Sequence, residues 1–396
     1  MTRPAELRAR LAPAVVLLGF TSLFTDVGTE MIFPLLPVFL TETLHAGPAY
    51  LGLVEGAADT VSGLLKLASG LMADRVSRRK PLVLFGYALA SAVRPFVAVA
   101  SRPWHVLAVR VTDRVGKGIR SSPRDALIAD AAGDRAGRAF GFHQAMDNAG
   151  AVAGPLLATG LVAASLSVRS VLWAAVVPGA VATILVAFVR EPPRDRSPAR
   201  AAPNRTSGCF FLSPPLAAYL SILGLFSLGN SSDAFLLLRA RELGLTTAQI
   251  PVLWAALNLS KVVWAYVGGD LADRVPRARL VAGGWIVFAL VYAGLANATA
   301  SWHAWALFVA YGIFYGLTEP VEKALVKELV PAEARGRAYG AYNFVVGIAA
   351  LPAGLLTGAL WRTFSPPIAL EAGAGLAGAA SVLLLSWDLW RSRGAA

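Results

Sequence analysis

The chain has 396 residues, of which 56% are hydrophobic and only 15% are charged. This balance excludes a soluble multidomain protein and predicts an integral membrane protein. The formal net charge is +12, but the cations cluster in short segments between apolar runs, as topology signals do, so we expect no nucleic-acid partner. A single cysteine, Cys209, excludes an internal disulfide, and the four histidines lack paired spacing, so we expect no metal site and no cofactor.

Apolar segments long enough to cross a bilayer follow one another along the chain. The first begins at Leu11, continues through Asp26 and Glu30 and ends at Leu40; no small-x-small site closes it, which argues against a signal peptide. Five more lie at about 49–72, 81–101, 104–129, 137–163 and 169–189, and six at about 215–240, 247–269, 279–299, 303–329, 336–362 and 367–387. We therefore predict about twelve transmembrane helices.

A segment rich in Pro, Arg, Ala and Ser at residues 190–208 is typical of a linker. It divides the chain into an N-terminal half (1–189), a cytoplasmic linker (190–214) and a C-terminal half (215–396). If the spans alternate, one side of the membrane holds the linker and Arg3, Arg8, Arg10, the 74–80 turn, Arg391 and Arg393. The opposite turns hold mainly Arg102, Arg169, Arg239, Arg241 and Arg362. We therefore expect a multi-pass protein of the cytoplasmic membrane with both termini in the cytoplasm.

The two halves repeat each other. GLMADRVSRR at 70–79 is echoed by GDLADRVPRA at 269–278, and GRAFG at 137–141 by GRAYG at 336–340. The same offset of 199 residues separates Asp74 from Asp273 and Arg138 from Arg337. Paired six-helix halves related in this way form the midplane site of many secondary transporters.

The fourth span is the most heavily charged. Between Trp104 and Ala131 it carries seven charged residues on one face: Arg110, Asp113, Arg114, Lys117, Arg120, Arg124 and Asp125. An ionised side chain at the bilayer centre costs about 3 kcal/mol, so this face must adjoin a bundle interior or a water-filled cavity. Arg120 and Arg124 can be explained as interfacial cations, and Asp113 can pair with Arg110 or Lys117. Two or three cations remain to bind a solute.

The turns after the second and eighth spans resemble the signature cytoplasmic loop of the major facilitator superfamily, and the resemblance covers essentially the whole chain. It implies an all-α membrane protein with twelve transmembrane helices in two pseudo-symmetric six-helix bundles. It also implies a gating role for Gly70, Asp74, Arg75, Arg78, Asp273 and Arg274. Ser77 and Pro276 stand where the family usually has glycine. The alternative is that the loops only anchor the topology through their positive charge.

Two further stretches resemble the drug:proton antiporter branch of that family. Gly141, Gly150, Gly154 and Pro155 in the fifth span are similar to its antiporter motif, although Ala158 and Thr159 replace the closing glycines. Arg114 to Gly118 resembles its arginine motif, with Lys117 in place of an amide and Arg110 in place of a leucine. The glycines are equally explained as close packing between helices.

Acids supply the predicted proton sites. Asp26 and Glu30 lie one helical turn apart in the first span, and acids in a desolvated site can carry a proton through a conformational cycle. Asp113 and Asp147 are further candidates. The alternative is that these acids only neutralise the arginines of the fourth span.

The sequence therefore predicts a proton-coupled secondary transporter, not an enzyme, that exports a small organic solute or drug of anionic or amphiphilic character. Its expected solute contacts are Arg110, Arg114, Lys117, Glu319 and Asn230. We find no nucleophile paired with a base and no catalytic site. The expected partners are the solute, protons and the lipid bilayer, and we expect a monomer. A proton-driven importer of an organic anion and a non-transporting receptor remain alternatives.

Overall fold

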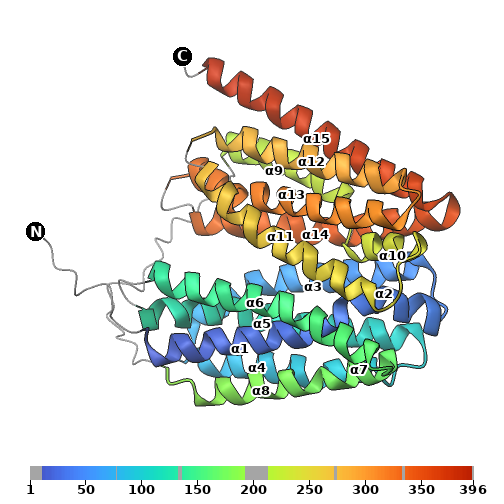
Figure 1. Ribbon diagram of the computed structural model, residues 1–396. Helices are drawn as coiled ribbons and strands as arrows, with labels where there is room; N and C mark the ends of the chain where they lie inside the picture. The colour runs from blue at the N-terminus through green and yellow to red at the C-terminus, as the bar shows by residue number, and fades with distance from the viewer. Residues whose placement is uncertain are drawn as a thin grey trace, which may run out of the picture.

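The computed structural model describes residues 11–76, 78–132, 136–191, 213–271, 274–331 and 335–394. Within those ranges the chain forms twelve helical rods and no strand (Figure 1). The rods form two bundles of six, one from each half of the chain, and the long axes of the rods are roughly parallel. This is the all-α, two-bundle fold that the sequence predicts.

The N-terminal bundle contains the first six rods. They are α1 (Pro13–Ile32) continued by η2 (Phe33–Leu35), α2 (Leu36–Val38) and η3 (Phe39–Thr43); α3 (Pro48–Arg75); α4 (Lys80–Val93) with η4 (Arg94–Val97); α5 (Pro103–Ala132); α6 (Ala136–Ala163); and α7 (Val168–Ala174) with α8 (Val176–Phe188). The first rod leaves α-helical geometry at η2, a 3-10 segment that contains Pro34, and again at η3, a π-helical segment that follows α2. Pro34 and Pro37 both lack the N–H that continues the hydrogen-bond ladder.

The C-terminal bundle contains the other six rods. They are α9 (Pro214–Gly229) with α10 (Ala234–Glu242); α11 (Gln249–Leu271); α12 (Arg277–Ala296); α13 (Ser301–Glu328); α14 (Arg335–Thr363); and α15 (Pro366–Gly394). Its core is aromatic: Phe226 stacks on Trp285 with ring centroids 4.4 Å apart, and Phe288 stacks on Tyr292 at 4.0 Å. The seventh rod is broken between α9 and α10 by the sequence Asn-Ser-Ser-Asp, whose side chains compete for backbone hydrogen bonds.

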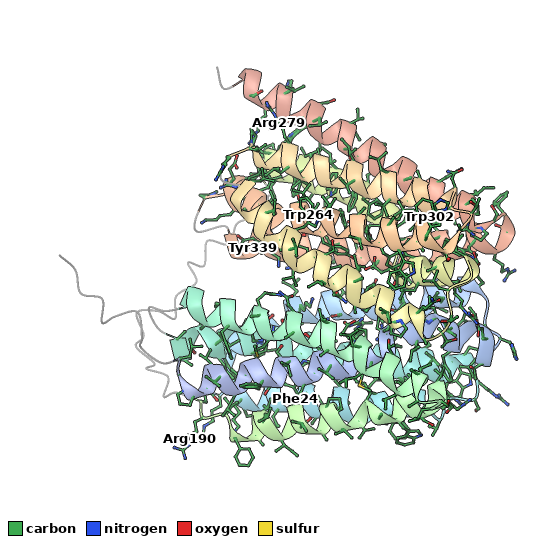
Figure 2. The ribbon with its side chains drawn as sticks, in the orientation of Figure 1. Phe24, Arg190, Trp264, Arg279, Trp302 and Tyr339 are labelled. Carbon is green, nitrogen blue, oxygen red and sulfur yellow. The ribbon has the colours of Figure 1, made fainter. Side chains whose placement is uncertain are left out.

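The two ends of the rods differ. We call the end where α8 leads to Arg190 and α9 begins after Ser213 the linker end. We call the opposite end, where α2, α10 and Trp302 lie, the far end (Figure 2). At the far end Glu42 and Arg241 form an ion pair of 2.6 Å between the bundles. Figure 1 shows α6 and α11 close together toward the far end and diverging toward the linker end.

Glycines hold α3 and α14 in contact across the bundle boundary. A Cβ on Gly56 would lie 2.8 Å from the Cα of Leu351, and one on Gly63 would lie 3.0 Å from the Cα of Gly347. Thr60 Oγ1 donates to the Gly347 carbonyl at 2.7 Å between them. Small residues at this spacing let two membrane helices touch backbone to backbone, which forms one side wall of the space between the bundles.

Six helical segments in the described part of the chain are long and apolar enough to cross a membrane: Pro13–Thr43, Val168–Phe188, Pro214–Glu242, Arg277–Ala296, Ala338–Thr363 and Pro366–Ser392. The helices α3, α5 and α13, which carry many of the charges, are not among them. Their charges must therefore be sheltered by the apolar rods, as in a transporter with a polar interior.

Candidate solute-binding cavity

A cavity of about 410 Å³ lies between the two bundles. Its polar and charged lining comes from both halves of the chain: Asp26, Thr29, Glu30, Asp59, Ser62, Lys66, Arg114 and Lys117 from the first, and Ser227, Asn230, Ser231, Ser232, Asp233, Lys261, Tyr315 and Asn343 from the second. Four acids and four bases face it. A binding site at the boundary of two bundles is the arrangement expected of a solute pathway.

The N-terminal wall of the cavity carries three cations. Arg114 and Lys117 project from α5, and Lys66 projects from α3. Arg114 Nε lies 3.6 Å from Asp59 Oδ1, beyond a hydrogen bond. Within the described part of the chain, the ammonium groups of Lys66 and Lys117 have no ion pair or hydrogen bond. Two lysines that face the cavity beside a loosely held arginine make this wall cationic, and such groups can donate charge-assisted hydrogen bonds to an anion.

Arg110 and Asp113 lie on the same helix but do not line this cavity. Arg110 is 4% exposed and holds Glu55 through two hydrogen bonds of 2.9 and 2.7 Å. Asp113 is 2% exposed and pairs with Arg94 Nε at 2.8 Å. Asp113 was predicted to pair with Arg110 or Lys117, but its partner is Arg94. Of the four inner charges, Arg110 and Asp113 each belong to a buried pair, whereas Arg114 and Lys117 face the cavity.

Toward the linker end, α5 carries Arg120 and Arg124. Arg120 is buried, with its guanidinium carbon 4.2 Å from the centre of the Tyr87 ring, so it is not an exposed interfacial cation. Arg124 donates to the neighbouring Asp125 at 2.9 Å. Neither residue lines the cavity.

The acids of α1 meet the glycines of α6. Asp26 and Glu30 both line the cavity. A Cβ on Gly150 would lie 2.9 Å from the Cβ of Asp26, and one on Gly154 would lie 2.9 Å from the Cβ of Glu30. The glycine spacing in α6 therefore matches the acid spacing in α1, and absent side chains let the two helices meet at the acids.

The remaining predicted residues of α6 are spread along it. Asp147 accepts a hydrogen bond from Ser22 of α1 and lies 3.6 Å from His143, outside the cavity lining. Pro155 is buried within the helix, and Gly141, near the linker end, has open space around its Cα.

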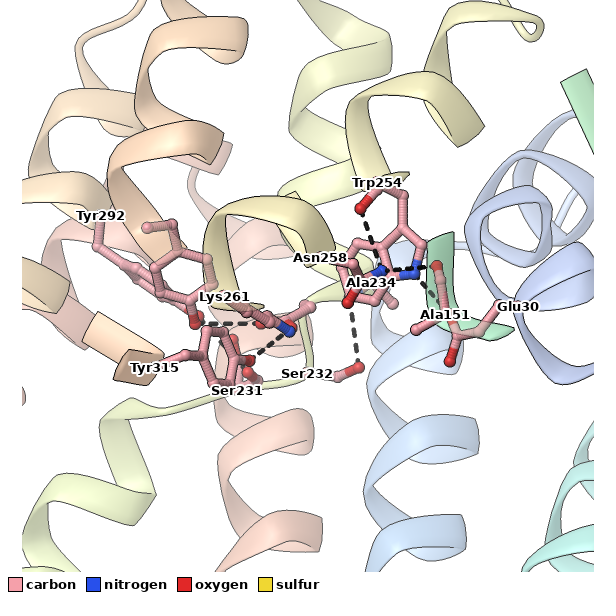
Figure 3. Close-up of polar contacts among 12 residues, drawn as sticks. Glu30, Ala151, Ser231, Ser232, Ala234, Trp254, Asn258, Lys261, Tyr292 and Tyr315 are labelled. Carbon is pink, nitrogen blue, oxygen red and sulfur yellow. Dashed lines mark hydrogen bonds and ion pairs between the residues drawn. The ribbon is translucent and has the colours of Figure 1, made fainter. Parts of the chain in front are cut away.

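The C-terminal wall is built around the break between α9 and α10. Asn230, a predicted solute contact, directly follows α9 and lines the cavity. Asp233 directly precedes α10 and accepts hydrogen bonds from Tyr311 at 3.1 Å and Tyr315 at 2.6 Å. Lys261 Nζ lies 3.8 Å from Asp233 and 3.6 Å from the centre of the Tyr315 ring (Figure 3). Both oxygens of Asp233 are thus engaged inside the C-terminal bundle.

Sequence reasoning missed several cavity residues. Trp254 and Tyr315 resemble ordinary core aromatics in sequence, and the signal that pointed toward this wall was the polar interruption of the seventh and eighth spans, which includes Lys261. Conversely, Glu319 is exposed and does not line the cavity. On the same helix, Glu322 is buried and accepts hydrogen bonds from Trp285 at 3.1 Å and Tyr342 at 2.6 Å.

The signature loops lie at the linker end, away from the cavity. A Cβ on Gly70 would lie 3.6 Å from Ser122 Oγ, and Arg78 and Arg274 are exposed. Arg79 pairs with Asp130 of α5 at 2.5 Å, and the Glu191 carboxylate accepts from the backbone N–H of Arg79 at 2.7 Å. Asp273 lies outside the described residues, as do the side chains of Asp74 and Arg75 and the linker from 192 to 212.

Two six-helix bundles around a charged central cavity are the architecture of a secondary transporter. The chain belongs to the Major Facilitator Superfamily, whose family model matches residues 18–354. No group of three or more metal-ligating side chains occurs in the part of the chain that the structure describes.

Two proteins that are similar in sequence are also named as a transporter or an efflux pump. The chain is 32% identical over 382 residues to an uncharacterized MFS-type transporter of Methanocaldococcus jannaschii, covering 95% of each chain. It is 23% identical over 340 residues to the multi-drug resistance efflux pump PmrA of Streptococcus pneumoniae, covering 82% of this chain and 83% of that one.

Solved structures share the fold. The nucleoside transporter NupG superposes with a TM-score of 0.72 at 14% identity, covering 95% of this chain and 98% of that one. The human organic anion transporter MFSD10 gives a TM-score of 0.65 at 15% identity, covering 97% and 100%.

Proposed function

We propose that this transporter exports a small organic anion in exchange for protons. The observation that carries the proposal is the N-terminal wall of the cavity, where Lys66 and Lys117 have no partner in the described chain and Arg114 is only loosely held by Asp59. A carboxylate or phosphate placed among these cations would form charge-assisted hydrogen bonds with them. An amphiphilic solute would set its apolar part against Phe33 and Trp254, which line the same cavity.

The proton-carrying role falls to Asp26. Its carboxylate lines the cavity without an ion pair or hydrogen bond in the described chain, and its charge interacts with that of Lys117. We no longer include Arg110 in the proposed solute site or Asp113 in the proposed proton site, because each already forms an ion pair with a buried partner. Asp147 keeps a secondary place, since its charge also interacts with that of Asp26.

Alternating access would be produced by rocking the bundle of residues 1–189 against that of residues 215–396, with the signature loops as gating contacts at the linker end. The far end, closed here by the ion pair of Glu42 and Arg241, would open in the other state. Export is supported by the resemblance of the α6 glycines to the antiporter motif and by the similarity to PmrA, an efflux pump. The protein would then act as a monomer in the cell membrane with the linker end in the cytoplasm.

The experiment that tests this proposal is a thermal-shift titration of the purified protein in detergent, because a ligand that binds the folded state raises its stability by about 2.7 kcal/mol at one hundred times its Kd. Citrate and glucose 6-phosphate would be compared at equal ionic strength with glucose, glycine betaine and tetraphenylphosphonium. We expect stabilisation by at least one anion, lost in Lys117→Gln.

The matched control is Lys327→Gln, which removes an exposed lysine near the end of α13 and should leave the response unchanged. Stabilisation by tetraphenylphosphonium alone would contradict the anion assignment and would instead indicate a transporter of lipophilic cations.

A further inference from the structure

Glu30 stands apart from the other acids of the cavity because it is bonded across the bundle boundary. Trp254 Nε1, on α11 of the C-terminal bundle, donates to Glu30 Oε2 at 2.5 Å. About one turn farther along the first rod, Phe33 of η2 packs on the same indole with ring centroids 4.9 Å apart. Asp26, by contrast, has no such partner in the described chain. Two acids one turn apart on α1 are therefore in different chemical situations.

The contact belongs to a polar seam along one face of α11. Asn258 lies one turn after Trp254 and donates both to the Trp254 carbonyl at 3.1 Å and, across the boundary, to the Ala151 carbonyl of α6 at 3.2 Å (Figure 3). Nearer the far end, Thr159 Oγ1 of α6 lies 3.4 Å from the Ala248 carbonyl. These contacts occupy the half of α11 toward the far end, where α6 and α11 run close together.

The chemistry of the contact makes it depend on Glu30 as an acceptor. An indole N–H can only donate, and its hydrogen bond is stronger to an ionised carboxylate than to a neutral acceptor. No cation lies within ion-pair distance of Glu30 in the described chain, so the indole is its one hydrogen-bonding partner there. Removal of either group breaks this hydrogen bond between α11 and α1.

The same indole reaches the solute site. Lys261 Nζ lies 5.0 Å from the centre of the Trp254 ring, on the side of the cavity where it also contacts Asp233. A solute entering the cavity meets both Trp254 and Lys261. The indole thus connects the N-terminal bundle, through Glu30, to the charged wall of the C-terminal bundle.

We propose that the Glu30–Trp254 contact is a latch that holds the far end of the cavity closed, and that Glu30 positions the bundles rather than carrying the transported proton. This inference rests on the proposed function in that it divides the roles of Asp26 and Glu30, but the latch itself is a property of the protein without solute. Glu30 and Trp254 are positioning residues, with Asn258 reinforcing them.

The test measures the opening of the far end directly. Spin labels would be placed by cysteine substitution at Ser101 and Thr299, exposed loop positions at the far end of the N-terminal and C-terminal bundles, after Cys209→Ser. Double electron–electron resonance then gives the populations of short and long separations in nanodiscs, with neither solute nor proton gradient present.

We expect Trp254→Phe, which keeps the ring but removes the donor, to shift the populations toward the long separation by about tenfold or more, as for loss of a hydrogen bond to a charged group. Glu30→Ala should do the same, and Glu30→Gln, which retains an acceptor oxygen, should restore much of the closed population. Trp173→Phe makes the same change at an exposed indole of α7 and should have no effect.

Unchanged populations in both Trp254→Phe and Glu30→Ala would overturn the latch. So would a shift in Asp26→Asn as large as that in Glu30→Ala, because the effect would then belong to cavity charge in general. Asn258→Ala should shift the populations in the same direction, which keeps the test decisive if one variant at Trp254 folds poorly. The readout involves no transport, so its failure leaves the proposed anion export standing, and failure of the export proposal leaves the latch standing.

Discussion

The buried pair of Glu55 and Arg110 gives the sharpest test of the division between structural and solute-binding charges. The perturbation is Glu55→Gln, which keeps the size and shape of the side chain but leaves the guanidinium of Arg110 without its counter-charge. The pair is bidentate, at 2.9 and 2.7 Å, and the two residues are 1% and 4% exposed. Water cannot replace the lost partner at that depth.

Breaking a buried ion pair by removing one partner costs about 3–5 kcal/mol. We expect Glu55→Gln to lie near the lower end, because the amide still offers one acceptor oxygen. Replacing both residues together, as Glu55→Leu with Arg110→Met, should recover most of the loss, since a well-packed apolar pair is often as stable as a buried ion pair. Lys117→Gln, at a cavity wall with no partner to lose, should change stability by less than about 0.5 kcal/mol.

The assay is the free energy of unfolding in mixed micelles for wild type, Glu55→Gln, the double variant, Lys117→Gln and Arg110→Gln, followed by anion titration of each protein that stays folded. We expect the free energy of unfolding to fall in Glu55→Gln and the anion affinity to fall in Lys117→Gln. An Arg110→Gln variant that is as stable as wild type but no longer binds anions would refute this reasoning and return Arg110 to the solute site.

The same geometry makes three more predictions. Lys117→Gln should weaken anion affinity about tenfold with unchanged thermal stability, as for loss of one charge-assisted hydrogen bond; equal Kd values by calorimetry would count against it. Gly154→Ala should destabilise the protein by about 1–3 kcal/mol, because its Cβ would lie 2.6 Å from the Val27 carbonyl oxygen, whereas Gly160→Ala, with open space around it, should be nearly neutral. Asp26→Asn should abolish proton-driven flux in proteoliposomes but leave solute exchange; retained proton-driven flux would reject Asp26 as the carrier.

Much of the fold was predictable because bilayer thickness fixes helix length and the internal repeat fixes the pairing of halves. The twelve rods begin and end near the predicted spans. The break of the seventh rod falls at residues 230–233, whose polar side chains interrupt an otherwise apolar run in the sequence. The linker end could also be recognised, because the basic turn near residues 74–80 and Arg190, where the predicted linker begins, lie on the same side.

The division of charges within one helix was not predictable. Arg110 and Arg114 are one turn apart on α5, yet the first is held by Glu55 and the second faces the cavity. Which acid each arginine meets depends on how α3 and α4 pack against α5, and a single sequence does not contain that register. For the same reason Arg94, rather than a neighbour on α5, became the partner of Asp113.

Trp254 is a second residue whose contact could not be predicted from the sequence. Its apolar surroundings in sequence are typical of a core aromatic, and only the approach of α11 to α1 turns its N–H toward Glu30. Contacts between bundles join residues far apart in the sequence, 224 positions in the case of Glu30 and Trp254, and they depend on the conformational state. Periodicity and composition describe each helix alone, so they cannot identify such contacts.

Proton-coupled anion transport is tested most directly in proteoliposomes that contain a trapped pH dye and carry an imposed pH gradient. A panel of carboxylates and phosphate monoesters would be added one at a time, with wild type, Lys117→Gln and Asp26→Asn measured in parallel. We expect at least one anion to accelerate dissipation of the pH gradient in wild type, and no anion to do so in Lys117→Gln or Asp26→Asn. Dissipation by lipophilic cations alone, or equal dissipation in Asp26→Asn and wild type, would contradict it.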